Sequence, residues 1–161
     1  MCCTRLTSYC HRRLGRTSGL YGLRGSRSKG SSFIERILAQ AEEGTPIRVV
    51  TDVVTSPSCT VDVARGIRAL VDGAPPGTYH VANGGACSWY EFACAALRLA
   101  GFAEARVEPT TAAAFPSKVR RPPYSALAGE GLARAGIAPL ADWQSALAGY
   151  FAQRSLARAV R

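Results

Sequence analysis

The sequence has few residues that bind metals or form disulfides in recognisable patterns. Its 161 residues include two histidines and six cysteines, and no two cysteines are spaced as a C-x-x-C pair. A zinc site would need poorly spaced ligands, so we expect buried or inert thiols in a reducing, cytoplasmic compartment. No apolar run approaches the ~20 residues of a bilayer span, which excludes a transmembrane helix and a membrane partner.

The usual phosphate-binding loops are also missing. No G-x-G-x-x-G follows a predicted strand, and no G-x-x-x-x-G-K occurs anywhere. Gly19, Gly22 and Gly25 repeat at a different spacing, which is typical of turns. The residues alone therefore predict no dinucleotide or triphosphate cradle.

Acidic residues are absent from the start of the chain. Residues 1–30 hold seven of the twenty lysines and arginines and none of the eleven acids, so the net charge of +9 arises mostly there. The rest of the chain is nearly balanced and offers no strong field for a polyanion. Nucleic acid is not the expected partner, although a basic nucleic-acid binder acting through residues 1–30 stays an alternative.

What the sequence does contain is short strands alternating with amphipathic helices. Ser32 with Glu35 and Ser88 with Glu91 are capping boxes that begin two of the helices. Pro57 interrupts residues 51–60, which are predicted as a loop. The alternation predicts an α/β fold. Helical spacing of apolar residues predicts helices near 33–41, 63–71, 92–100 and 143–151, and strands are predicted at 47–50, 78–82 and 106–108.

Several segments carry side chains that suit a ligand. Thr17 and Ser18 lie near the end of a predicted strand, and Asp52 directly follows another. Open α/β sheets display their binding groups at such positions. A carboxylate there could accept hydrogen bonds from sugar hydroxyls. Arg120 and Arg121 lie in a proline-bounded loop, and their guanidinium groups suit the oxygens of a diphosphate. The alternatives are an ordinary turn at each strand end and a solvated basic loop.

Two further features have mainly structural interpretations. His80 is a lone histidine on a strand, which favours a hydrogen-bonding role over a general base. The free amides at the helix start near Ser88 could meet an anion, but the capping box already satisfies them. Core packing is the default for the aromatic residues of the last helix.

Six motifs in order resemble the C-terminal part of the dTDP-4-dehydrorhamnose reductase family, over about residues 14–151. The family belongs to the extended short-chain dehydrogenases. The motifs are R-T-S-x-L-Y-G, F-I-E-R-I-L-A-Q-A, R-V-V-x-D-x-x-x-S-P-S, D-V-A-R-G-I, G-T-Y-H-V-A-N-G-G-x-C-S-W-Y-E-F-A and F-P-S-K-V-R-R-P-P-Y-S-A-L.

The resemblance implies the C-terminal fragment of an NAD(P)-binding Rossmann-fold reductase that reduces dTDP-4-dehydro-L-rhamnose with NADPH. Family members use a Tyr-x-x-x-Lys pair, and no tyrosine here has lysine four residues on. We therefore assign no catalytic residue and expect the chain to be inactive alone. Much of the rate enhancement in such a reaction comes from positioning the hydride donor, the proton donor and the carbonyl together, which a substrate-binding portion cannot do by itself. The alternative is a nucleotide-sugar-binding or subunit-docking module without catalysis.

The resemblance also implies site residues. By position, Thr17 and Ser18 would lie near the nicotinamide end of the cofactor. The substrate side would include Gly19, where the family usually has a tryptophan, together with Asp52, Arg120, Arg121 and Ser125. Some family members dimerise or bind magnesium, but no metal ligands are identified in this sequence.

Three segments are expected along the chain. Residues 1–13 are read as an unrelated or mistranslated leader, residues 14–153 as the substrate-binding portion, and residues 154–161 as a basic tail. The expected partners are a dTDP-sugar nucleotide and either a second copy of the chain or an intact reductase subunit.

Overall fold

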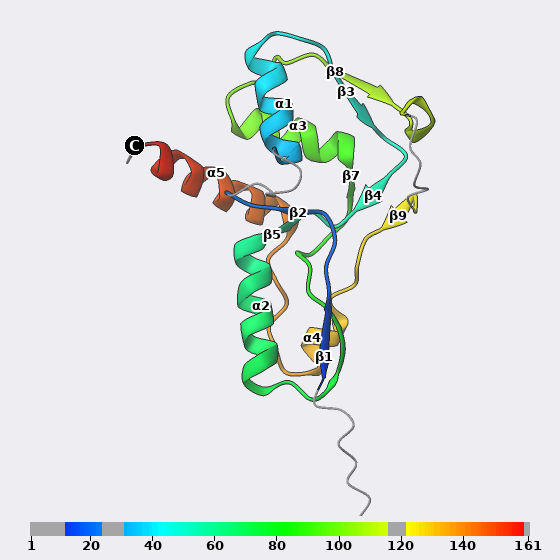
Figure 1. Ribbon diagram of the computed structural model, residues 1–161, viewed down its shortest axis with the longest axis vertical. Helices are drawn as coiled ribbons and strands as arrows, with labels where there is room; N and C mark the ends of the chain where they lie inside the picture. The colour runs from blue at the N-terminus through cyan, green and yellow to red at the C-terminus, as the bar shows by residue number, and fades with distance from the viewer. Residues whose placement is uncertain (1–11, 24–30, 116–121, 160–161) are drawn as a thin grey trace, which may run out of the picture.

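The computed structural model describes residues 12–23, 31–115 and 122–159 (Figure 1). Short strands and helices form one mixed α/β structure, which confirms the predicted fold class. Figure 1 shows one group of elements around α2 and a second group around α1 and α3, with α5 extending to the side. Short strand pairs join the two groups.

The first group is a parallel strand pair covered by two helices. Strand β1 (Arg13–Arg16) pairs with β6 (Gly77–His80), and the helices are α2 (Thr60–Gly73) and α4 (Glu130–Arg134). Tyr79 and Val81 lie two residues apart and so share one face of the sheet. That face packs against both helices in a core of Val63, Leu70, Ala74, Tyr79, Val81 and Leu132.

The second group is larger and rich in aromatic residues. Strand β3 (Ile47–Val50) pairs in parallel with β8 (Val107–Thr110), and the helices are α1 (Phe33–Glu42), α3 (Trp89–Leu99) and α5 (Trp143–Ala159). Phe92 is 1% exposed and lies at its centre. Its ring contacts Tyr21, Phe33, Trp89 and Trp143, with centroid distances of 5.2 to 6.1 Å.

Five strands of two residues each connect these groups. Strand β2 (Leu20–Tyr21) pairs in parallel with β5 (Ser58–Cys59), while β4 (Val54–Thr55) lies between β7 (Cys87–Ser88) and β9 (Tyr124–Ser125). A 3-10 turn, η1, covers Ala112–Ala114. The prediction that residues 51–60 form a loop is therefore wrong in part. Pro57 separates two strands that form because distant segments supply their hydrogen-bond partners.

The helix starts follow the local sequence. At α3 the Ser88 hydroxyl accepts from the Glu91 N–H and the Glu91 carboxylate accepts from the Ser88 N–H, which confirms the capping box. These hydrogen bonds hold the pKa of Glu91 below its usual range. At α1 the Ser32 hydroxyl accepts from the Glu35 N–H.

A strand and a helix lie at the two ends of the described chain. Strand β1 begins at Arg13, and α5 continues to Ala159, so residues 154–159 are part of a helix. Arg154 makes two hydrogen bonds of 3.0 and 3.1 Å to the Glu35 carboxylate, which fixes α5 against α1. Among the residues described, no helix is long and apolar enough to cross a membrane.

Candidate functional site

The candidate site lies where the carboxyl ends of the short strands meet. Because β1 and β6 are parallel, the segments that follow them leave from the same edge of the sheet, the usual position of ligand sites in open α/β sheets. Strands β4 and β9 also run in parallel and end beside this edge. We call the following six residues the strand-end cluster: Ser18, Thr55, Ser56, Ser58, Asn83 and Ser125.

Three of these residues connect segments that are far apart in the sequence. The Ser18 hydroxyl lies 2.7 Å from the Thr55 hydroxyl and donates to the Ser125 carbonyl oxygen at 2.8 Å. The Ser125 hydroxyl donates to the Val54 carbonyl at 3.1 Å. Ser18 and Ser125, two residues that the resemblance places in the site, are therefore in direct contact.

Gly19 lies against the same segment in a left-handed conformation, with φ of +53°. A Cβ atom at this position would lie 3.0 Å from the Thr55 hydroxyl oxygen and 3.1 Å from the Pro57 Cα. The Gly19 carbonyl accepts from the Ser58 N–H. Any other residue would therefore be strained here and would have to displace these neighbours.

Asn83 is the buried centre of the cluster, with 0% of its surface exposed. Its side-chain oxygen accepts from the Cys59 N–H at 2.8 Å, and its amide nitrogen donates to Asp62 and to the Ala141 carbonyl at 3.0 and 2.9 Å. Its backbone N–H donates to the Ser58 hydroxyl. One side chain thus joins β5, α2 and the segment before α5.

Ser56 extends the network toward the chain that follows β9. Its hydroxyl donates to the Gly85 carbonyl at 2.9 Å and accepts from the Leu127 N–H at 3.1 Å. We did not expect Ser56 or Asn83 to be important from the sequence. The available signal was a run of small polar residues directly after a strand, which usually indicates only a turn.

The other predicted site residues lie elsewhere or are not described. Asp52 follows β3, and its carboxylate accepts from the Ala112 N–H at 2.9 and 3.1 Å, so it bonds to the first residue of η1. Thr17 is exposed beside Ser18. Arg120 and Arg121 lie outside the described residues, and their contacts with a ligand stay predictions.

Two of the three described cysteines are buried, as the sequence predicts, and Cys94 is half-buried. Cys59 and Cys87 are buried, and burial raises the pKa of Cys87 to about 12, with a smaller contribution from the Glu91 carboxylate. Such a thiol is protonated and unreactive near neutral pH. Within the described ranges, no group of three or more His, Cys, Asp or Glu side chains could hold a metal ion.

The described residues do not fit a dinucleotide cofactor by themselves. The Ser18 hydroxyl is already bonded to Thr55 and Ser125, and no glycine-rich phosphate loop precedes it in the sequence. A cofactor would have to be held mostly by groups outside this part of the structure. Contact of Thr17 or Ser18 with such a cofactor is therefore a prediction only.

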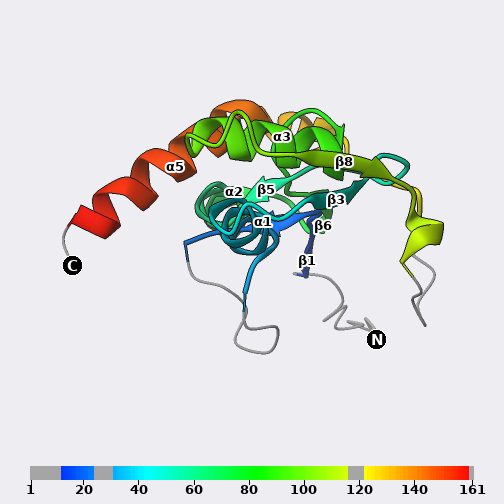
Figure 2. The same ribbon diagram turned by 90° about the horizontal axis from the view of Figure 1, so that it is seen from above.

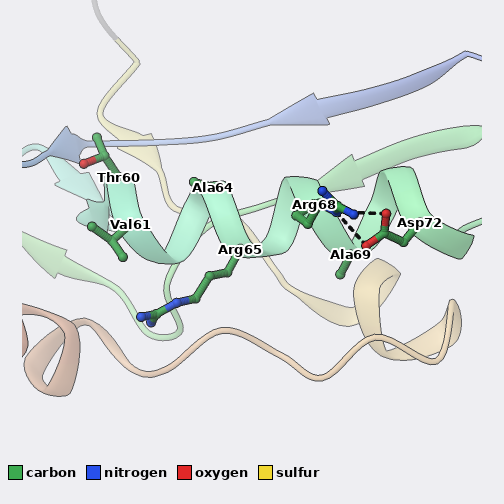
Figure 3. Close-up of a pocket in the computed structure, with 7 residues that line it drawn as sticks. All are labelled: Thr60, Val61, Ala64, Arg65, Arg68, Ala69 and Asp72. Atoms are coloured by element: carbon green, nitrogen blue, oxygen red, sulfur yellow. Dashed lines mark hydrogen bonds and ion pairs between the residues drawn. The ribbon is translucent and has the colours of Figure 1, made fainter.

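An open hollow of about 640 Å³ lies along α2, away from the strand-end cluster (Figure 3). Seven residues of α2 between Thr60 and Asp72 line it. Figure 3 shows Arg68 paired with Asp72, at 2.8 Å, while Arg65 lies 3.2 Å from Asp62. Both arginines pair with an aspartate of the same helix and are largely exposed.

Solved structures show which class of protein has this arrangement. The chain superposes on the crystal structure of dTDP-4-dehydrorhamnose reductase from Bacillus anthracis in complex with NADP, with a TM-score of 0.77 and 31% identity. The match covers 88% of this chain and 48% of that one. The chain therefore has the fold of one part of an NAD(P)-binding Rossmann-fold reductase.

Sequence comparisons define the family. Residues 7–156 match the family described as RmlD substrate binding domain, and the chain belongs to this family. It is 42% identical over 142 residues to the spore coat polysaccharide biosynthesis protein SpsK of Bacillus subtilis, covering 88% of this chain and 47% of that protein. It is 35% identical over 137 residues to dTDP-4-dehydrorhamnose reductase of Streptomyces griseus, covering 82% and 43%. The chain spans about half the length of these relatives.

Proposed function

We propose that this chain is the substrate-binding portion of a dTDP-4-dehydrorhamnose reductase and that it binds a dTDP-linked sugar at the strand-end cluster. The family match over residues 7–156 carries the proposal. The contact between the Ser18 hydroxyl and the Ser125 carbonyl supports it. The resemblance places Ser18 near the nicotinamide end of the cofactor and Ser125 on the substrate side, so the two implied sites adjoin. The proposed location is the cytoplasm, where such precursors are made.

The proposed chemistry is reduction of the 4-keto group of dTDP-4-dehydro-L-rhamnose, with NADPH as hydride donor. In this scheme the chain's own residues bind and orient the nucleotide sugar. Ser18 and Ser125 border the sugar, Gly19 keeps the backbone close to Pro57, and Arg121 contacts the diphosphate. The hydride donor and the proton donor belong to a cofactor-binding half, because the sequence of this chain has no Tyr-x-x-x-Lys pair.

We expect replacement of Arg121 by alanine to weaken the binding of dTDP-L-rhamnose by roughly thirtyfold or more. A guanidinium group makes charge-assisted, bidentate hydrogen bonds to phosphate oxygens, and losing them costs about 2 kcal/mol or more, roughly a thirtyfold loss in affinity. The measurement is isothermal titration calorimetry of the chain with dTDP-L-rhamnose.

The matched control is Arg98→Ala, which removes an exposed arginine from α3. It should bind as the unaltered chain does. Equal affinities for Arg121→Ala and Arg98→Ala would remove the diphosphate contact from the proposal. Binding lost equally in both variants would point to a nonspecific charge effect instead.

A further inference from the structure

The serine hydroxyls of the strand-end cluster all donate their hydrogen to the chain itself. A hydroxyl group has one hydrogen and two lone pairs, whereas a backbone carbonyl can only accept. Each of the four serines donates to a carbonyl: Ser18 to Ser125, Ser56 to Gly85, Ser58 to Ser56 and Ser125 to Val54. No serine of the cluster therefore keeps a hydrogen for a ligand.

The direction of the hydrogen bond between Ser18 and Thr55 follows from these bonds. The two hydroxyl oxygens lie 2.7 Å apart, a distance that is compatible with either donor. Because the single hydrogen of Ser18 is donated to the Ser125 carbonyl at 2.8 Å, Thr55 must be the donor to Ser18. The Thr55 hydrogen is then used as well, and it occupies one lone pair of Ser18.

Two of the six side chains remain accessible to a ligand. Ser18 and Ser125 are half-buried. The other four are at most 2% exposed: Thr55, Ser56, Ser58 and Asn83. Within the described residues, the Ser18 hydroxyl oxygen accepts from Thr55 alone and the Ser125 hydroxyl oxygen only donates, to Val54. The side chains of the cluster therefore present lone pairs to a ligand and no hydrogen.

We propose that the strand-end cluster selects a ring hydroxyl of the sugar, at carbon 2 or carbon 3, which donates a hydrogen bond to Ser18 or Ser125. This proposal rests on the proposed function and states how the sugar lies in that site. The oxygen at carbon 4 faces away from the two serines. A ketone oxygen has lone pairs and no hydrogen, so the lone pairs of the serines would repel it.

The chemistry of the proposed reaction favours the same orientation. Carbon 4 must receive the hydride and its oxygen must receive the proton, and both donors belong to the cofactor-binding half in the proposed function. A sugar that turns carbon 2 or carbon 3 toward Ser18 and Ser125 leaves carbon 4 open to those donors. A diphosphate also lacks a hydrogen to donate at neutral pH, so the cluster disfavours it as an occupant.

Asp52, the other acceptor that the sequence suggests for a sugar hydroxyl, is bonded to the chain elsewhere. Both of its carboxylate oxygens accept from the N–H of Ala112, the first residue of η1. Figure 2 shows this turn, in yellow-green, beyond the end of β8 and on the opposite side of the molecule from the end of α5. We therefore assign the sugar hydroxyl to Ser18 and Ser125 instead of Asp52.

The test is calorimetric titration of the full chain with dTDP-L-rhamnose and with analogues that carry hydrogen or fluorine in place of one ring hydroxyl. Fluorine is close to a hydroxyl group in size and accepts weakly, but it cannot donate. At carbon 2 or carbon 3 we expect both analogues to bind about fivefold more weakly or worse, the loss of one neutral hydrogen bond. The fluoro analogue should bind no better than the deoxy analogue. The matched analogues at carbon 4 should stay within about twofold of dTDP-L-rhamnose.

Alanine variants test the direction of the hydrogen bonds from the side of the protein. Ser18→Ala removes an acceptor and frees the Thr55 hydrogen, and Ser125→Ala removes the other acceptor. At least one of them should reduce the fluorine penalty by about threefold or more. The matched control is Ser155→Ala near the end of α5, where the serine hydroxyl also donates to a backbone carbonyl, that of Phe151. It should keep the full penalty.

The outcomes separate this inference from the proposed function. No binding of dTDP-L-rhamnose by the folded chain would overturn both. Binding that is unchanged by hydrogen or fluorine at carbons 2 and 3, or a fluoro analogue that binds better than the deoxy analogue, would overturn the hydroxyl assignment alone. A loss that is largest at carbon 4 would also overturn it. Equal fluorine penalties in all three alanine variants would assign the hydroxyl to a different acceptor.

Discussion

Replacing Asn83 by leucine is expected to lower the free energy of unfolding by about 3–4 kcal/mol. The substitution removes an acceptor for the Cys59 N–H and a donor for the Ala141 carbonyl in a fully buried position. Each buried polar group left without a partner costs about 1–3 kcal/mol, and leucine supplies none of the lost hydrogen bonds. Urea denaturation followed by circular dichroism measures the change.

A conservative variant keeps this result interpretable. Asn83→Asp retains an acceptor for the Cys59 N–H but loses the donor and places a carboxylate beside Asp62 in a fully buried position, so a loss of at least similar size is expected at neutral pH. The control Gln144→Leu changes an exposed polar residue of α5 and should alter stability by less than about 0.5 kcal/mol. Asn83→Leu with the stability of the control would show that this network does not hold the strand ends together.

Placing tryptophan at position 19, as the resembling family usually has, is expected to destabilise the chain by about 2–4 kcal/mol. A non-glycine residue in the left-handed region costs about 1–2 kcal/mol, and overpacking adds about 1–3 kcal/mol. The contact with the Pro57 Cα involves backbone and cannot be relieved by a rotamer change. Tryptophan at position 19 should therefore not improve binding of the nucleotide sugar while the backbone at residue 19 and at Pro57 keeps its present position.

Two alanine variants separate backbone strain from close packing. Gly44 also has a positive φ, of 69°, but nothing lies within 4 Å of a Cβ atom added there. Gly44→Ala should cost about 1 kcal/mol from strain alone, and Gly19→Ala should cost more. Equal losses would mean that the space around Gly19 is less restricted than the contacts with Thr55 and Pro57 imply.

The helices could be predicted because their information is local. Apolar residues at helical spacing and the serine caps at Ser32 and Ser88 define α1 and α3 to within a residue or two. Strands such as β4 and β9 could not be predicted. Each has two residues and forms only by pairing with distant segments, β9 with β4 and β4 with both β9 and β7. Their formation depends on tertiary contacts that single-sequence patterns do not contain.

Only part of the candidate site could be predicted, because its hydrogen bonds also depend on tertiary contacts. The resemblance identified Ser18, Gly19 and Ser125, which the structure brings to one place. It did not predict that the Thr55 hydroxyl would connect Ser18 to β4, or that Asn83 would join three segments from a position typical of a turn. Asp52 had the right residue type for a sugar contact, but its carboxylate accepts from the backbone at Ala112.

The most direct test of the central claim is to map the binding of dTDP-L-rhamnose by the amide chemical shifts of an isotope-labelled chain. The account predicts saturable shifts concentrated at Ser18, Gly19, Thr55 and Ser125, with little change along the hollow of α2. Shifts confined to α2, or no shifts from a folded chain at saturating ligand, would contradict the assignment of a nucleotide-sugar site to the strand ends.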